Sequence, residues 1–322
     1  MSKSFLFQPL AAALLVALSL PTVAAAQDEG HKKAPLKPAI VLAAFGTSEV
    51  DALESILNVE KKVREAFPGY DVHLAFTSNI IRNIWHHRAK ETKFKSENKI
   101  PAEIYTITNP LTTLALLQEE GPRPIMVQSL HITNGSEFDH LKSIVDQLNG
   151  IKVLQESKKP FPSLALGESA LGNGDQANLD RAAKALESLV TMAKADGSAL
   201  VLMGHGNEHK DVKSYRDFAA AMNKMYGHPI FLGLVEGSPE FDDVLAELKK
   251  ANVKKVLLAP FMLVAGDHAK NDMAGDEEDS WATMLKAEGI TVKTHVQGLG
   301  AIDAWADIYV ERLKALEGSL KK

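Results

Sequence analysis

Cysteine is absent from the 322-residue sequence. This absence excludes disulfides, thiolate nucleophiles, cysteine-based zinc sites and iron–sulfur clusters, so any metal ion must be bound by His, Asp or Glu. Nucleotide-binding loops are missing as well: there is no Walker loop, and "GHGNEH", "GNGD" and "GLGA" do not make a dinucleotide fingerprint. We therefore expect no nucleotide cofactor.

A basic surface for nucleic acid is also lacking, because the net charge is −5 and the basic residues are scattered. No stretch after the N-terminal segment is long and apolar enough to cross a bilayer, so we expect no membrane span in the mature chain. The composition is globular, with 45% apolar and 24% charged residues. A chain of this length has room for a large core or for two joined lobes.

The first 26 residues have the features of a signal peptide. An apolar run over residues 10–20 is followed by small residues that end in an Ala-Ala-Ala cleavage site at 24–26. An uncleaved membrane anchor is the alternative, but the run is short for a bilayer and Pro21 interrupts it. We expect residues 1–26 to be removed on export to the periplasm and residues 27–38 to form a flexible leader.

From residue 39 the sequence alternates between buried-strand and amphipathic-helix patterns. Short aliphatic runs predict strands at 39–46, 71–78, 104–108 and 124–132. Helical spacing of apolar residues predicts helices at 50–67 and 138–150, which end at Pro68-Gly69 and at Gly150. Strands that alternate with helices indicate an α/β fold with a mostly parallel sheet.

The same order of elements starts again at residue 199. Strands are predicted at 199–206, 229–237 and 254–268, with helices at 212–227 and 239–253. The two halves align as "VLAAFGTSE" with "VLMGHGNEH", "HLAFTSN" with "FLGLVEG", and "IMVQSLHITNGSE" with "VLLAPFMLVAGDH". This internal duplication predicts two similar lobes, residues 39–195 and 196–322, that face each other across a cleft.

Three polar residues of the second half stand at successive predicted strand ends. The alignment pairs Phe45 with His205, Ser78 with Glu236, and Glu137 with His268. Ligands of open α/β sheets bind outside the carboxyl ends of the strands. Two imidazoles and a carboxylate suit a divalent ion such as Co, Ni, Fe or Zn, and three protein ligands leave a position open. The alternative is that these are hydrogen-bonded structural residues.

The remaining histidines carry weaker signals. His209 lies four residues after His205 but beyond a glycine-rich turn, which favours a solvated or supporting role. His86 and His87 lie in a basic segment, interpreted as a solvated face with anion binding as the alternative. His140, one turn after Glu137, is either an exposed helix residue or an axial ligand to a haem b outside the cleft. Others, namely His73, His228 and His295, are expected to be structural.

Seven sequence blocks together carry a family resemblance. They are "FGTS" (45–48), "AFTSNIIRN" (75–83), "VQSLHITNGSE" (127–137), "MGHGNEH" (203–209), "VEGSPEFD" (235–242), "MLVAGDHAKNDMAGDEEDSW" (262–281) and "GLG" (298–300). With them, residues 39–320 resemble the class II tetrapyrrole chelatases, and among these the anaerobic sirohydrochlorin cobalt chelatases. The resemblance implies two flavodoxin-like lobes, a tetrapyrrole cleft between them, and no need for ATP.

The resemblance also implies roles for individual residues. His205, Glu236 and His268 match the family's metal ligands, and Glu137 matches an active-site position that faces the macrocycle. The implied reaction inserts Co²⁺, or alternatively Fe²⁺, into sirohydrochlorin with release of two protons, and His205 or His268 would act as base because histidine exchanges protons near neutral pH.

The sequence departs from the family pattern in its export signal, in a basic insertion near 86–99 and in a longer stretch before residue 199. The competing hypothesis is therefore an exported carrier of a tetrapyrrole, haem or metal that uses the same cleft without turnover. A homo-oligomer is compatible with either function.

Overall fold

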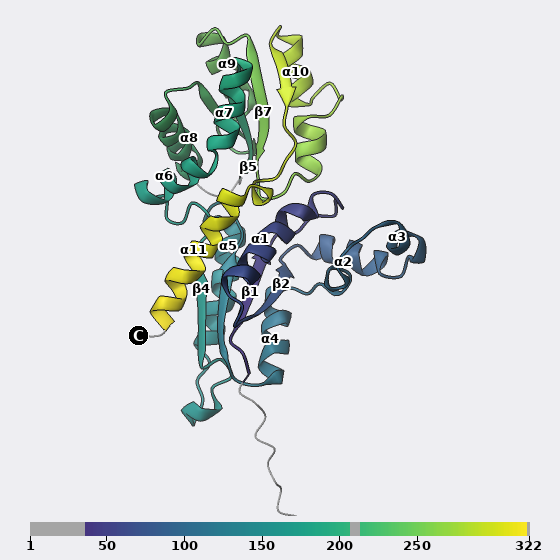
Figure 1. Ribbon diagram of the computed structural model, residues 1–322, viewed down its shortest axis with the longest axis vertical. Coiled ribbons are helices and arrows are strands. Elements are labelled where there is room, and N and C mark those ends of the chain that lie inside the picture. The colour runs from purple at the N-terminus through teal and green to yellow at the C-terminus, as the bar shows by residue number, and fades with distance from the viewer. Residues whose placement is uncertain (1–35, 207–212, 321–322) are drawn as a thin grey trace, which may run out of the picture. The chain divides into compact units, whose positions relative to one another are not determined.

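The computed structural model describes residues 36–206 and 213–320, and within them it contains two parallel four-stranded sheets. The first sheet has the strand order β2-β1-β3-β4 and the second the order β6-β5-β7-β8 (Figure 1). The strands are β1 (Ala39–Ala44), β2 (Asp71–Phe76), β3 (Pro124–Ser129), β4 (Ser163–Gly167), β5 (Ala199–Gly206), β6 (Ile230–Glu236), β7 (Lys255–Phe261) and β8 (Thr291–Thr294). Both orders reverse at the first strand of the lobe, and ligands of open sheets bind at such a reversal.

Helices connect successive strands in both lobes. The first lobe contains α1 (Leu53–Ala66), α2 (Asn79–Arg88), α3 (Thr92–Glu97), α4 (Pro110–Glu120), α5 (Ser136–Asn149), α6 (Gln176–Ala185) and α7 (Glu187–Asp196), with the short helices η1 (Ala102–Thr106) and η2 (Glu156–Lys158). The second contains α8 (Lys213–Tyr226), α9 (Phe241–Lys250), α10 (Trp281–Ala287) and α11 (Asp303–Leu320), with η3 (Ala269–Met273) and η4 (Leu299–Ala301). The predicted two-lobed α/β fold is confirmed.

The strand registers of the two sheets reproduce the sequence repeat. Ala43 is paired with Ala75 and Ser129 in the first sheet, and its repeat partner Met203 is paired with Gly233 and Pro260 in the second. These pairings match the alignment of the two halves residue by residue. Positions equivalent in the repeat are therefore equivalent in the two lobes.

Both faces of each sheet are covered, as an all-parallel sheet requires. Along β1, Ile40 and Leu42 pack toward α1, whereas Val41 and Ala43 pack toward α4 and α5. The second sheet is built in the same way: even-numbered residues of β5 pack toward α8, and odd-numbered residues pack toward α9 and α10. Burial on both faces explains why these strands are continuous apolar runs.

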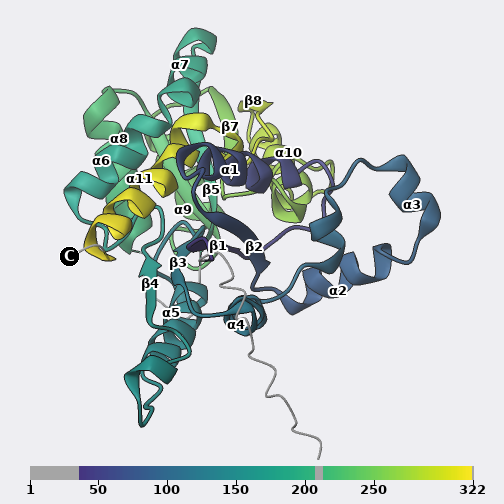
Figure 2. The same cartoon turned by 60° about the horizontal axis from the view of Figure 1, so that its bottom comes forward.

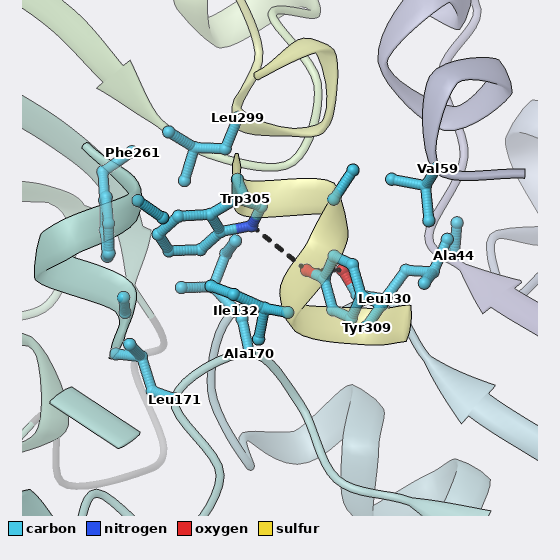
Figure 3. Packing of buried hydrophobic residues seen from close by; sticks show 14 of the residues in the cluster. Ala44, Val59, Leu130, Ile132, Ala170, Leu171, Phe261, Leu299, Trp305 and Tyr309 are labelled. Carbon is cyan, nitrogen blue, oxygen red and sulfur yellow. Dashed lines mark hydrogen bonds between the residues drawn. The ribbon is translucent and has the colours of Figure 1, made fainter. Parts of the chain in front are cut away.

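The helix that follows the last strand of each lobe packs on the other lobe. α6, which follows β4, contacts α8, and α11, which follows β8, contacts α1, β3 and β4 (Figure 1). In α11 the buried Tyr309 hydroxyl accepts a hydrogen bond from Trp305 at 3.4 Å and donates one to the carbonyl of Leu130 at 3.0 Å (Figure 3). The expected division between residues 195 and 196 falls at the end of α7, and packing crosses it in both directions.

One predicted strand is wrong. Residues 104–108 do not join the sheet, and most of this segment lies in the 3₁₀ helix η1. Ile104 and Tyr105 are buried because they pack beside α2, where the rings of Tyr105 and Trp85 meet edge to face at 6.0 Å. The apolar pattern was therefore a sign of burial and not of sheet pairing. Both α2 and α3 lie beyond the β2 edge of the first sheet (Figure 2).

The predicted signal peptide and most of the predicted leader, within residues 1–35, lie outside the described residues. Within residues 36–206 and 213–320, no helix is long and apolar enough to cross a membrane. For the described part of the chain, this finding agrees with the expectation that the mature chain has no membrane-spanning helix. The acidic segment 275–280 precedes a helix: Ser280 caps α10 by accepting a hydrogen bond from the Thr283 amide at 3.2 Å.

Candidate functional site

A cleft of about 640 Å³ lies where the carboxyl ends of the two sheets meet. Its walls come from the segments after β1 and β3 in the first lobe and from the ends of β5, β6 and β7 in the second. The volume is in the range of small-molecule and cofactor sites. Phe45, Glu137, His205, Glu236 and His268 all line it, so five of the six residues that the repeat aligned at strand ends reach one cavity. The sixth, Ser78, caps α2 instead, where its hydroxyl accepts a hydrogen bond from the Ile81 amide.

His205 and Glu236 are neighbours because β5 and β6 approach closely at their ends. Gly206 has a φ of +83°, and a Cβ atom at this position would lie 1.8 Å from the carbonyl oxygen of Glu236. Glycine is therefore required here, and it brings Nδ1 of His205 to 3.8 Å from Oε2 of Glu236. The Nδ1–H of His205 donates to the Gly206 carbonyl at 3.2 Å, which leaves Nε2 with its lone pair.

His268 reaches the same place from the loop after β7. It lies seven residues beyond the end of β7, directly before η3, and not within a strand as the sequence pattern suggested. Its Nδ1–H donates to Oδ2 of Asp272 at 2.5 Å, an arrangement that orients an imidazole and leaves Nε2 as the ligand atom. The rings of His205 and His268 lie 5.0 Å apart, edge to face.

The three side chains adjoin without forming a closed metal site. Their exposed fractions are 46% for His205, 43% for Glu236 and 40% for His268. Across residues 36–206 and 213–320, no group of three His, Asp or Glu side chains has the arrangement that holds a metal ion. Exposed side chains with free ligand atoms can turn toward an arriving ion, and few ligands favour its later release.

Glu137 lies on the first-lobe side of the cleft, at the N-terminus of α5. Its Oε2 accepts a hydrogen bond from the Thr77 hydroxyl at 2.8 Å, which ties it to the end of β2. Phe45 and Glu137 line the cleft at the positions that correspond to His205 and His268. The first lobe therefore contributes an aromatic ring and a carboxylate where the second contributes two imidazoles.

Lys270 ties the loop of His268 to the first lobe. Its ammonium group lies 2.7 Å from a carboxylate oxygen of Glu49 and 2.6 Å from one of Asp51, in the segment between β1 and α1. The hydrogen bond from Lys270 lowers the pKa of Asp51. On its other side, this segment is held by Trp85, whose indole N–H donates to the Thr47 carbonyl at 2.8 Å. The Lys270 ammonium group thus links the loop after β7 to the segment after β1, both of which contribute residues to the cleft.

His131 is a cleft residue that the sequence analysis did not single out. Its Nδ1 pairs with the Ser129 hydroxyl at 2.8 Å, and its Nε2 is buried without a hydrogen-bond partner among the described residues. Burial lowers the pKa of His131 to about 4, while the charge of Glu137 acts in the opposite direction. The ring is therefore neutral near pH 7. In the sequence, His131 stands in the apolar segment "SLHI". A single histidine in such a segment has no spacing that distinguishes a cleft residue from a structural one.

Among the described residues, the other histidines lie away from the cleft lining. His140 is exposed on α5, and His87 is exposed on α2. His209 lies outside the described residues. Three others donate hydrogen bonds from Nε2 to oxygen atoms of the protein, as structural residues do: His86 to the Ile107 carbonyl, His228 to the Ser198 carbonyl and His295 to the Gln297 side chain. In His73 the Nε2 atom is buried, and burial lowers the pKa.

Comparison with known proteins agrees with this geometry. A protein-family model described as cobalt chelatase (CbiK) matches residues 38–317. The sirohydrochlorin cobaltochelatase CbiKC of Nitratidesulfovibrio vulgaris is 32% identical over 286 residues, 88% of this chain and 92% of the relative. The sirohydrochlorin cobaltochelatase of Salmonella typhimurium is 31% identical over 280 residues, 86% of this chain and 96% of the relative.

Two solved structures share the fold. The sirohydrochlorin chelatase SirB from Bacillus subtilis subspecies spizizenii, solved in complex with cobalt, superposes with a TM-score of 0.55 at 14% identity, covering 88% of this chain and 99% of that one. A multi-domain protein from Deinococcus radiodurans with structural similarity to chelatases gives 0.53 at 11% identity, covering 86% of this chain and 55% of that one. At these identities the likeness concerns the fold alone.

Proposed function

Because the chain belongs to the cobalt chelatase (CbiK) family, we propose that it inserts Co²⁺ into sirohydrochlorin, releasing two protons and using no ATP. The observation that supports this most directly is the position of His205, which adjoins both Glu236 and His268 in one cleft. In the proposed step two pyrrole N–H bonds are replaced by bonds to the ion and two protons are released, with no nucleotide among the reactants.

The residues of the cleft suit the two parts of this reaction. His205 and His268 present Nε2 atoms as neutral ligands, and the Glu236 carboxylate offsets the charge of the arriving ion. The ion is a substrate, so it must be passed to the pyrrole nitrogens, and three exposed ligands can be displaced one at a time. Glu137 or one of the two imidazoles then takes a pyrrole proton as each nitrogen binds the metal.

An absorbance assay tests the proposal. The purified protein is incubated with sirohydrochlorin and Co²⁺, and in parallel with Fe²⁺, which suits the same ligands. We expect the metallated spectrum to accumulate well beyond one equivalent of protein, and faster with Co²⁺. Accumulation that stops at one equivalent contradicts catalysis and favours the exported carrier, which would use the same cleft without turnover.

We further propose that the protein acts in the periplasm. Support comes from the N-terminal sequence, in which an apolar run of signal-peptide length precedes an Ala-Ala-Ala cleavage site. Every strand of the two lobes begins at residue 39 or later, so removal of residues 1–26 leaves the sheets complete. A periplasmic location would separate this chain from a cytoplasmic cobamide pathway. The absorbance assay uses purified protein, so its outcome does not depend on the location.

A haem b at His140 remains a prediction. His140 is exposed, but the described side chains beside it on the outer face of α5 are polar, including Asp139, Lys142 and Ser143. One chain therefore does not supply the apolar surface that a haem usually buries, so the residues around His140 do not fit a haem by themselves. A haem there would need a second protein surface over its other face, such as that of a second copy of the chain. A Soret band in the purified protein that disappears in His140→Ala is the expected sign of such a site. A Soret band unchanged in that variant contradicts the assignment.

A further inference from the structure

Phe45 is a large apolar side chain that the fold leaves open in the cleft. Its exposed fraction is 48%. Among the described residues that line the cleft, no other large apolar side chain is exposed. Single exposed apolar residues are common on protein surfaces and need no explanation by themselves. This one differs because it lies inside a ligand-sized cavity, one residue beyond β1.

The backbone holds Phe45 in this position. Its carbonyl accepts a hydrogen bond from the Ser78 amide at 3.2 Å, which ties it to the end of β2. Gly46 follows with a φ of +101°, and a Cβ atom there would lie 2.7 Å from the ring of Phe76. Glycine is therefore required at the turn, and the close approach of Gly46 to the Phe76 ring fixes the backbone directly after Phe45. A side chain that contacts a ligand needs such a fixed backbone position.

The repeat adds an independent argument. Phe45 is the counterpart of His205, as the pairing of Ala44 with Phe76 and of Gly204 with Leu234 shows. The two residues border the cleft from equivalent positions in the two lobes. Because both residues line the same cleft, a flat ligand bound there can lie between the phenyl ring of one lobe and the imidazole of the other.

We propose that Phe45 is a substrate-contacting residue on which the tetrapyrrole plane stacks, so that the opposite face of the macrocycle is presented to His205, Glu236 and His268. This inference rests on the proposed function. Aromatic stacking suits a conjugated macrocycle because an offset ring pair is attractive beyond the apolar area that it buries. Phe45 would thus determine affinity for the planar substrate and leave affinity for the ion to the second lobe.

The test separates the shape of the side chain from its aromatic character. Four proteins are compared: wild type, Phe45→Ala, Phe45→Leu and Phe45→Trp, with Ile80→Ala as the control. Ile80 is 74% exposed on α2 and does not line the cleft. Metal-free sirohydrochlorin is titrated into each protein and followed by its absorbance, Co²⁺ affinity is measured by calorimetry without tetrapyrrole, and KM and kcat are measured for metallation. Circular dichroism checks the fold.

We expect Phe45→Ala and Phe45→Leu to weaken sirohydrochlorin binding and to raise KM by roughly twofold to tenfold. Phe45→Trp and Ile80→Ala should stay close to wild type, and Co²⁺ affinity should be unchanged in all variants. Full sirohydrochlorin affinity in folded Phe45→Ala, or equal loss of Co²⁺ affinity, overturns the inference. Failure of the wild-type protein to metallate sirohydrochlorin overturns the proposed function instead, so the two failures are distinct.

Discussion

The imidazole rings of His205 and His268 lie 5.0 Å apart at 82° to each other, and in both rings Nδ1–H donates to an oxygen atom of the protein itself. Both Nε2 atoms are thereby left as acceptors. If these atoms bind the incoming ion, removal of either ring deletes a ligand. We expect His205→Ala and His268→Ala each to lower the rate of cobalt insertion by more than about a hundredfold.

The fold should survive both changes, because the two side chains are exposed and add little to the core. Rates of metallosirohydrochlorin formation are compared with circular dichroism spectra of the same preparations. His87→Ala, a replacement of an exposed histidine on α2, serves as the matched control. Near-wild-type rates in well-folded His205→Ala and His268→Ala speak for the carrier function.

Asp272 should act on the metal only through His268. Asp272→Asn preserves the size of the side chain but removes the charged acceptor that orients the ring. We expect a loss of about tenfold to a hundredfold in Co²⁺ affinity, as for other outer carboxylates of metal-bound histidines. Calorimetry gives the affinity, and ¹⁵N spectra of labelled histidine report which ring nitrogen carries the hydrogen. If Asp272→Asn changes neither the tautomer of His268 nor the Co²⁺ affinity, Asp272 does not orient His268 for metal binding.

Lys270 should matter more for catalysis than for stability. Its ion pairs with Glu49 and Asp51 are partly exposed, and such pairs contribute about 1 kcal/mol or less. In Lys270→Met the loop of His268 loses its tie to the first lobe, so we expect kcat to fall roughly threefold to thirtyfold through misplaced groups. Urea unfolding and metallation kinetics are measured side by side.

The control for Lys270 is Lys142→Met, which removes an exposed ion pair within α5 alone. High salt should lower the wild-type rate toward that of Lys270→Met, because the ion pairs between the loops are screened. A Lys270 variant that behaves like the Lys142 variant in both measurements contradicts a role for the tie.

His131 predicts a loss of stability in acid. Burial lowers its pKa to about 4 in the folded protein, below the reference value of 6.5, so the unfolded chain binds this proton more tightly. The resulting stabilisation is complete above pH 6.5 and is lost as the pH falls toward 4, with a total of up to about 3 kcal/mol. Free energies of unfolding measured between pH 7.5 and 4 should therefore show a shallower slope in His131→Gln than in wild type. Parallel curves for His131→Gln and wild type would contradict a lowered pKa of His131 in the folded protein.

If the N-terminal segment is the proposed signal peptide, the mature chain should be shorter than the full sequence. Protein isolated from its native host should begin near Gln27 and appear in the periplasmic fraction. Intact-mass measurement and cell fractionation check this directly. A native protein that retains residues 1–26, or that is found wholly in the cytosol, contradicts the prediction.

The repeat, the alternation of strands and helices, and the meeting of His205, Glu236 and His268 in one cleft could all be predicted from the sequence. The reason is that strand burial and helix amphipathicity are local patterns, and parallel strands bring their carboxyl ends to one edge. A duplication then relates positions in one lobe to positions in the other without knowledge of any contact. The registers of Ala43 and Met203 confirm that relation.

Only the tertiary structure decided which distant groups meet. Tyr309 bonds to Leu130 across 179 residues, and Lys270 reaches Glu49 across 221, and neither pair leaves a periodic trace in the sequence. The same holds for segment 104–108, whose apolar residues are satisfied by burial beside Trp85 instead of sheet pairing. Local patterns report whether a side chain is buried, but its partner is chosen by the packing of the whole chain.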